Sequence, residues 1–220
     1  MDDLDPATWR LRVMGLADMS GADTAPASAA PVADKKSSGS RKKPPPTGES
    51  TSGAGGGAVQ TDMAMTGSPA LTLGLHAIKQ LPRIEIVTQL KCIEGWATVV
   101  RWAGARFADF VAQYPPETQS GNDPDVRHHP EDLAQYVSLV TPDGAYYVGL
   151  DMASALHPQT LLCYEMNGAP LSQDHGAPLR LVIPVKYGIK HLKRIGLIRY
   201  TNKRPADYWA EQGYDWYAGH

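Results

Sequence analysis

Residues 161–171 read Leu-Leu-Cys-Tyr-Glu-Met-Asn-Gly-Ala-Pro-Leu, and this stretch decides the fold class. Its first six residues form a short apolar run bounded by turn residues, which predicts a buried strand. Asn167 and Gly168 favour a tight turn directly after it, because both residue types tolerate positive φ. Cys163 lies inside the apolar run, so we expect it to act as a small core residue. The stretch therefore predicts a strand that turns back on itself.

Further strands are predicted on both sides of this stretch. Asp143-Gly144 marks another turn between two of them. Short helices are predicted over residues 73–81, 99–111 and 152–156, from apolar residues at helical spacing. The predicted strands cover residues 84–90, 136–140, 146–150, 179–185 and 197–200. Many strands with few short helices, and no regular alternation of the two, predict a mixed, β-rich α+β fold.

Composition restricts the classes of protein to which the chain can belong. Its 220 residues are 42% hydrophobic and carry a formal net charge of −2. That charge gives no general attraction to nucleic acid or to an anionic membrane. Cys92 and Cys163 are the two cysteines, too few for a disulfide framework or a four-cysteine zinc site. No apolar window reaches the roughly 18 residues of a membrane span.

Three segments differ sharply in composition. Residues 1–16 include Trp9, Leu11 and Val13, whose alternation with arginines predicts a first, half-buried strand. Residues 17–70 contain no Leu, Ile, Phe, Trp or Tyr. Such a stretch cannot bury enough apolar surface to offset its ordering entropy, so we expect a flexible low-complexity insertion. Residues 71–220 then form the main domain.

A cysteine stands at the end of a predicted strand in Lys91-Cys92-Ile93-Glu94-Gly95-Trp96. Its thiolate would be a soft ligand for a transition metal, held in place by the strand. The alternative is a buried cysteine that acts as a small hydrophobic residue. The hexapeptide alone leaves both interpretations open.

Residues 180–204 hold eight of the 21 Lys and Arg residues and no acidic residue. Such a concentration in an otherwise neutral chain favours a bound phosphate or another anion. The alternative is a solvated basic surface. Binding to nucleic acid is less favoured, because few aromatic residues interleave with the basic ones.

Several separated motifs resemble the sulfite oxidase family of molybdopterin-dependent oxidoreductases. These motifs occupy residues 164–171, 175–180, 181–184, 190–193 and 213–217. The stretch Cys92-Ile93-Glu94-Gly95-Trp96 resembles the molybdenum-ligand motif of the bacterial branch, which includes the methionine-sulfoxide reductase catalytic subunit. The resemblance implies a sulfite-oxidase-type molybdopterin-binding fold and a molybdenum-molybdopterin cofactor.

The resemblance also assigns roles to individual residues. It implies that Cys92 is the metal ligand and that Tyr214 lies beside the molybdenum. The reaction implied is transfer of an oxygen atom and two electrons, on a small oxyanion or sulfoxide-type substrate. The cofactor-binding positions implied are Thr141, His175, Arg180, His191, Leu192 and Lys193.

Two departures from the family pattern affect these expectations. The chain begins almost at its first strand, where relatives carry an upstream cofactor-contacting Asn, so the alternative is a cofactor-free remnant or scaffold of the same fold. Glu94, Gly95 and Trp96 stand where animal and plant sulfite oxidases have arginines, so sulfite is not the expected substrate.

The chain has no haem or flavin motif, which predicts a separate electron-transfer protein, haem- or quinone-linked. The acidic start at residues 1–5 lacks the basic-then-apolar order of a secretory signal, which predicts the cytoplasm. The resemblance allows the periplasm as well, so the localisation stays open.

Overall fold

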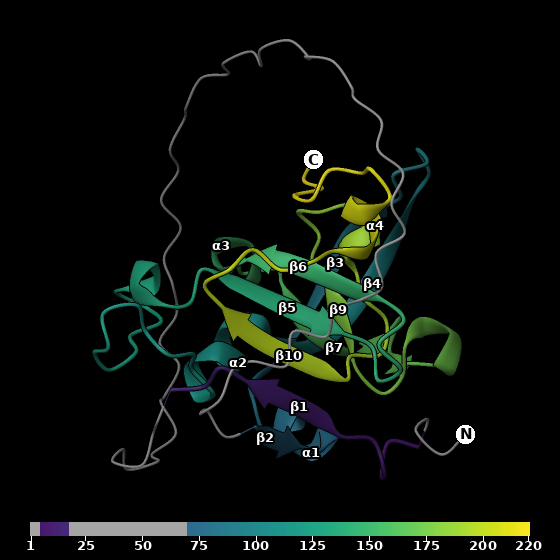
Figure 1. Ribbon diagram of the computed structural model, residues 1–220. Coiled ribbons are helices and arrows are strands. Elements are labelled where there is room, and N and C mark those ends of the chain that lie inside the picture. Colours follow the sequence, from purple (N-terminus) through teal and green to yellow (C-terminus); the bar gives the residue numbers. More distant parts are fainter. Residues whose placement is uncertain (1–4, 18–69) are drawn as a thin grey trace, which may run out of the picture. The chain divides into compact units, whose positions relative to one another are not determined.

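The computed structural model of the protein describes residues 5–17 and 70–220 (Figure 1). The predicted insertion at residues 17–70 lies almost wholly outside the described residues, so it stays a prediction. The described residues form two β-sheets with a few short helices, which confirms the predicted β-rich α+β class.

The first sheet brings together residues from both sides of the predicted insertion. Its strand order is β2-β1-β10-β5-β6, and β1 pairs parallel with β10, whereas the other pairs are antiparallel. Leu11 and Val13 are fully buried, which confirms the alternation expected at the N-terminus. The bounds are β1 Leu11–Met14, β2 Leu71–Leu73, β5 Tyr136–Val140, β6 Tyr147–Asp151 and β10 Leu197–Thr201.

The second sheet has the order β3-β4-β7-β8, and β9 also pairs with β7. The turn between β7 and β8 contains Asn167 and Gly168 at φ 53° and 84°, as the sequence predicts. The strand expected at residues 179–185 is shorter than predicted. The bounds are β3 Arg83–Lys91, β4 Ala97–Arg106, β7 Leu161–Met166, β8 Ala169–Pro170 and β9 Arg180–Val182.

The helix expected over residues 99–111 is wrong in its first half. Residues 97–106 form β4, and helix α2 occupies only Phe107–Gln113. β4 lies between β3 and β7, with a bulge at Ala103/Gly104, and Trp102, Ala103 and Ala105 are all buried. Burial on both faces removes the alternation that marks a strand, so the apolar spacing imitates a helix.

The remaining helices are short. The structure contains α1 Leu75–Lys79, α3 Met152–Ala155 and α4 Tyr208–Glu211, and the 3-10 turns η2 Pro130–Asp132, η3 Gln173–His175 and η4 Gly188–Lys190. The helix predicted over residues 73–81 is shorter in the structure, because Leu73 belongs to β2 and α1 covers only Leu75–Lys79. None of the helices among the described residues is long and apolar enough to cross a membrane.

The two sheets enclose the main core, to which both contribute buried side chains such as Leu139 and Leu162. A second cluster covers the other face of the second sheet, since neighbouring residues along β7 point to opposite faces. It consists of Val100, Trp102, Leu161, Cys163 and Val182. Cys163 is thus a core residue, as predicted, and the second cluster supports the candidate site.

Candidate cofactor site

Cys92 directly follows β3, at the start of the turn that leads into β4. The turn is closed by two backbone hydrogen bonds: the Cys92 N–H donates to the Trp96 carbonyl at 2.8 Å, and the Gly95 N–H donates to the Cys92 carbonyl at 3.1 Å. The thiol lies 3.9 Å from a carboxylate oxygen of Glu94 and is only partly buried. Cys92 therefore stands at a strand end, as predicted, and its sulfur is not sealed in the core.

The end of β3 lies against the turn η4. A Cβ atom at Gly188 would lie 3.3 Å from the carbonyl oxygen of Lys91, so the absence of a side chain lets the two backbones approach closely. The His191 N–H donates to the Gly188 carbonyl at 3.0 Å. The structure thus brings Cys92 into the neighbourhood of the predicted cofactor stretch at residues 191–193.

Arg180 is a buried cation without a negative partner. Its side chain lies over the indole of Trp102, with 4.9 Å from the guanidinium carbon to the ring centroid. Nη1 donates to the His175 carbonyl at 3.1 Å and Nη2 to the His191 carbonyl at 3.4 Å, whereas Nε has no partner. Within the described part of the chain Arg180 forms no ion pair, and burial lowers its pKa to about 10.

His191 has one ring nitrogen paired and one free. Nε2 lies 3.0 Å from the carbonyl oxygen of Ile183, so we assign the ring proton to Nε2. Nδ1 is buried and has no hydrogen-bond partner among the described residues. Burial, and next the charge of Arg180, lower the pKa of His191 to about 3, so the ring is neutral near pH 7. Nδ1 is therefore an unused acceptor.

Trp102, Arg180 and His191 form what we call the Arg180 cluster, because Arg180 contacts both the Trp102 ring and the His191 carbonyl. Each has a buried ring or guanidinium nitrogen with no partner. Buried polar atoms are almost always paired in native proteins. A ligand that satisfies this cluster must be anionic and must offer both an acceptor and a donor. A pterin carrying a phosphate meets that description, so the residues present fit the expected cofactor.

The other residues of the cofactor stretch lie around this cluster. Leu192 is buried, and its carbonyl accepts from the Leu181 N–H at 2.9 Å. Lys193 is exposed. It packs closely against Gly176, since a Cβ atom added to that glycine would lie only 2.8 Å from the Cβ of Lys193. The exposed His175 immediately precedes Gly176. The structure therefore brings the loops that carry His175 and Lys193 into contact.

Thr141 lies at the turn between β5 and β6. Its hydroxyl donates to an Asp143 carboxylate oxygen at 2.5 Å and accepts from the Tyr146 N–H at 3.1 Å. The next residue, Pro142, packs against Gly196: a Cβ atom added to Gly196 would lie 2.7 Å from the backbone of Pro142. Thr141 thus lies beside Gly196 of the basic segment, but its hydroxyl already closes the turn.

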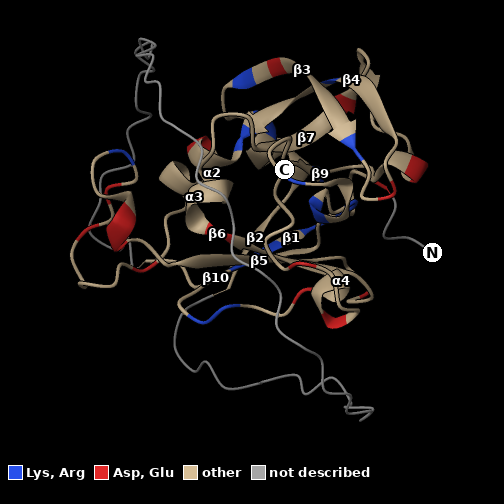
Figure 2. Cartoon of the chain, turned by 90° about the horizontal axis from the view of Figure 1, so that it is seen from above, with Lys and Arg blue, Asp and Glu red and all other residues tan. Residues whose placement is uncertain are grey.

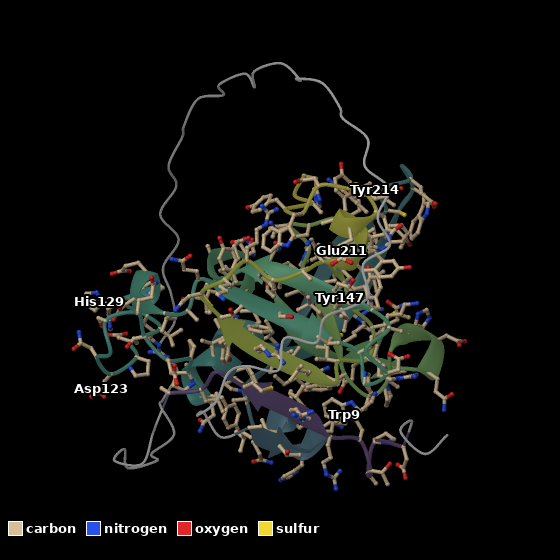
Figure 3. All side chains as sticks on the ribbon, viewed as in Figure 1. Trp9, Asp123, His129, Tyr147, Glu211 and Tyr214 are labelled. Carbon is tan, nitrogen blue, oxygen red and sulfur yellow. The ribbon has the colours of Figure 1, made fainter. Side chains whose placement is uncertain are left out.

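Tyr214 is not brought to the Arg180 cluster by any contact that it makes. Its ring packs edge-on against Trp209 with centroids 5.2 Å apart, and its N–H donates to the Trp209 carbonyl at 3.0 Å. Figure 3 shows it beside the end of α4, near Glu211. The residue is 42% exposed. Its assignment as a catalytic residue therefore stays a prediction.

Three buried residues of this region were not singled out from the sequence. Trp102 lies within the helix predicted over residues 99–111, and its role depends on its contact with Arg180, far along the chain. Lys186 and Lys190 lie within the basic segment at residues 180–204. The Lys186 ammonium lies over the Tyr217 ring and 3.6 Å from Asp151, and it has no hydrogen-bond partner in residues 5–17 and 70–220.

The long loop at residues 117–131 forms a separate, acidic region. His128 and His129 are exposed surface residues and pair with Asp125 and Glu131. A cavity of about 470 Å³ here is lined by Gln119, Ser120, Asn122, Asp123, Asp125, His129, Glu131 and Asp132. Figure 3 labels Asp123 and His129 of this loop, and in Figure 2 the blue Lys and Arg residues near β9 lie apart from it. The negative charge of this loop disfavours the binding of an anion there.

A family model described as the oxidoreductase molybdopterin binding domain matches residues 62–209. A putative protein-methionine-sulfoxide reductase subunit of Azospira oryzae is 38% identical over 145 residues, which cover 66% of this chain and 48% of the relative. The protein-methionine-sulfoxide reductase catalytic subunit of Campylobacter jejuni is 33% identical over 156 residues, covering 67% of this chain and 52% of the relative. The chain thus spans about half the length of these relatives.

The sulfane dehydrogenase SoxCD of Paracoccus pantotrophus has a similar structure, with a TM-score of 0.51. It is 16% identical, and the match covers 61% of this chain and 36% of that chain. At this identity the likeness supports the fold alone. The motifs, the fold and the matched family model agree, and the chain therefore belongs to the oxidoreductase molybdopterin-binding domain family, that of the sulfite oxidases.

Proposed function

We propose that the chain binds molybdenum-molybdopterin at the Arg180 cluster, with Cys92 as the protein ligand of the metal. The observation that carries this proposal is the buried Arg180 guanidinium, which has an open Nε and no ion pair among the described residues. A buried, unpaired charge is costly unless a ligand compensates for it. An anionic cofactor would compensate for it.

Each residue would contribute a different interaction. Arg180 offers a planar, charged donor to a phosphate, and the exposed ammonium of Lys193 adds a second positive charge. The Trp102 N–H and the His191 Nδ1 supply one donor and one acceptor for heteroatoms of the pterin. The thiolate of Cys92 is a soft ligand suited to the metal. When bound, the cofactor supplies two-electron redox chemistry with transfer of an oxygen atom.

We propose a sulfoxide-type substrate in preference to sulfite. Two relatives are named as methionine-sulfoxide reductase subunits. Next to Cys92 stand Glu94, whose carboxylate would repel an anion, and Trp96, which is 53% exposed and presents an apolar ring. This surrounding favours an uncharged sulfoxide over a doubly charged sulfite. Tyr214 is proposed to donate its phenolic hydrogen to the substrate oxygen.

Electrons are proposed to come from a separate haem- or quinone-linked protein. The chain contains no sequence motif for a second redox group. The whole relatives are about twice as long as the matched region, so a docking surface for that protein is not assigned to this chain.

The test begins with the full chain produced in a host that makes the cofactor. We expect about one molybdenum and one pterin per chain, and reduction of methionine sulfoxide by a reduced viologen dye at rates well above sulfite oxidation. Cys92→Ser should remove turnover and change the molybdenum spectrum while the melting temperature stays the same, because the side chain is not part of either core cluster. Protein without molybdenum or pterin would instead support the cofactor-free scaffold.

A further inference from the structure

Lys190, the residue directly before the cofactor stretch, forms a fully buried ion pair with Asp207. The ammonium lies 2.5 Å from Oδ2 of Asp207, and the two side chains are 1% and 2% exposed. Both partners also bind the backbone of Gly149 in β6: Lys190 donates to its carbonyl at 3.0 Å, and Asp207 accepts from its N–H at 3.1 Å. The pair therefore fixes the basic segment to the first sheet.

An aromatic residue closes the pair against water. The Trp216 ring lies over the Lys190 ammonium at 4.7 Å, and its indole N–H donates to the Pro205 carbonyl at 3.0 Å. A Cβ at Gly149 would lie within 2.7 Å of the Trp216 ring, so only glycine allows this closure. Burial lowers the pKa of Lys190, whereas Asp207 acts in the opposite direction. Within this dry environment the geometry of the pair is tightly defined.

Lys190 is also the residue directly before the cofactor stretch. It ends the turn η4, where its N–H donates to the Tyr187 carbonyl at 2.9 Å and its carbonyl accepts from the Leu192 N–H at 2.9 Å. The carbonyl of the next residue, His191, accepts from Arg180. A shift of Lys190 would therefore be passed directly to residues 191–193.

We propose that Asp207 is a positioning residue: it holds residues 191–193 in their binding geometry by anchoring the ammonium of Lys190. This proposal rests on the proposed function, because residues 191–193 need that geometry only if they bind the cofactor. Asp207 also caps helix α4, since its Oδ1 accepts from the Ala210 N–H at 3.1 Å. The two oxygens thus have two tasks, and an experiment can separate them. An asparagine keeps an oxygen for the cap but removes the charge that holds Lys190.

The first test measures amide hydrogen exchange on the full chain with and without bound cofactor. Asp207→Asn should increase exchange at the amides of His191 and Leu192 at least tenfold, while the amide of Ala210 changes less than twofold because its cap remains. Glu211→Gln is the matched control, since this carboxylate in α4 binds the Tyr147 hydroxyl and does not touch Lys190. It should leave residues 191–193 unchanged.

The second test asks whether Asp207 acts through Lys190. Pterin retained after gel filtration should fall at least tenfold for Asp207→Asn, and adding Asp207→Asn to Lys190→Met should cause no further loss. Additive losses would overturn the proposal, as would unchanged exchange at residues 191–193 in Asp207→Asn. If the single Lys190→Met variant does not fold, the double variant, which leaves no buried unpaired charge, is compared with Asp207→Asn alone. Wild-type protein that binds no pterin would refute the proposed function, but hydrogen exchange would still decide the role of Asp207.

Discussion

Replacing Arg180 by methionine should weaken cofactor binding without lowering the stability of the cofactor-free chain. Methionine has a similar length and can keep the contact with the Trp102 ring, but it has no charge. In the chain without cofactor, Arg180 is a buried cation whose carbonyl partners only partly replace water. A residue retained for packing would behave differently, because its loss would lower stability in both states.

The magnitude follows from the pKa of Arg180. Burial lowers it from 12.5 to about 10, and at ~1.4 kcal/mol per unit this corresponds to a cost of roughly 3 kcal/mol for holding the charge in the empty site. Methionine removes that cost and loses two hydrogen bonds worth about 1 kcal/mol each. The free energy of unfolding without cofactor should therefore be unchanged or rise by about 1 kcal/mol. With cofactor, loss of a charge-assisted donor should cost about 2–4 kcal/mol, a roughly thirty- to thousandfold loss of affinity.

Urea unfolding of the cofactor-free chain and pterin content after purification measure the two effects separately. Arg199→Met is the control, because Arg199 is exposed and carries the same charge. It should change neither quantity by more than a few tenths of a kcal/mol. A loss of more than about 3 kcal/mol for cofactor-free Arg180→Met would identify Arg180 as a packing residue. Wild-type pterin content in that variant would show that no anion binds there.

The pKa of His191 is lowered from 6.5 to about 3 in the folded chain, so between these values the unfolded chain binds a proton that the folded chain excludes. The free energy of unfolding should therefore fall as the pH drops through this range, by up to ~1.4 kcal/mol per pH unit. His191→Gln should flatten this pH dependence, measured by urea unfolding between about pH 4 and 6. Gly104→Ala should destabilise by several kcal/mol in thermal unfolding, because its Cβ would lie 2.2 Å from the Leu162 carbonyl oxygen, whereas Gly74→Ala meets no atom within 4 Å and should be nearly neutral. Lys193→Ala should reduce pterin content by less than Arg180→Met, since an exposed ammonium is screened by solvent; equal losses would contradict this ranking. Tyr214→Phe should reduce turnover and leave molybdenum content unchanged, and a loss of metal would contradict its assignment.

The sequence predicts well those features that depend on local pattern. The alternation of Leu11 and Val13 identifies β1, and the positive-φ residues at 167 and 168 identify the turn after β7. Cys92 lies at a strand end because an apolar run stops there. The predicted helix over residues 99–111 fails for a physical reason. β4 has neighbours on both sides and buried residues on both faces, so its apolar pattern carries no period of two.

The candidate site was predictable in part, because motifs identify positions and not contacts. Arg180 and His191 do lie together, and the structure adds Trp102, which packs on Arg180 from a distant strand. Thr141 lies beside Gly196 and uses its hydroxyl to close its own turn. Such contacts depend on the packing of the two sheets, which no local pattern determines.

The basic segment illustrates why charge counted along the sequence overstates an anion site. Residues 180–204 contain eight cations and no acid, yet the fold supplies acids from elsewhere. Lys190 pairs with Asp207, and Lys186 lies 3.6 Å from Asp151. Among the three buried cations of the segment, Arg180 alone has no carboxylate within ion-pair distance in the described part of the chain. A ligand with negative charge is therefore expected at Arg180, while the two lysines serve chiefly to hold the segment in place.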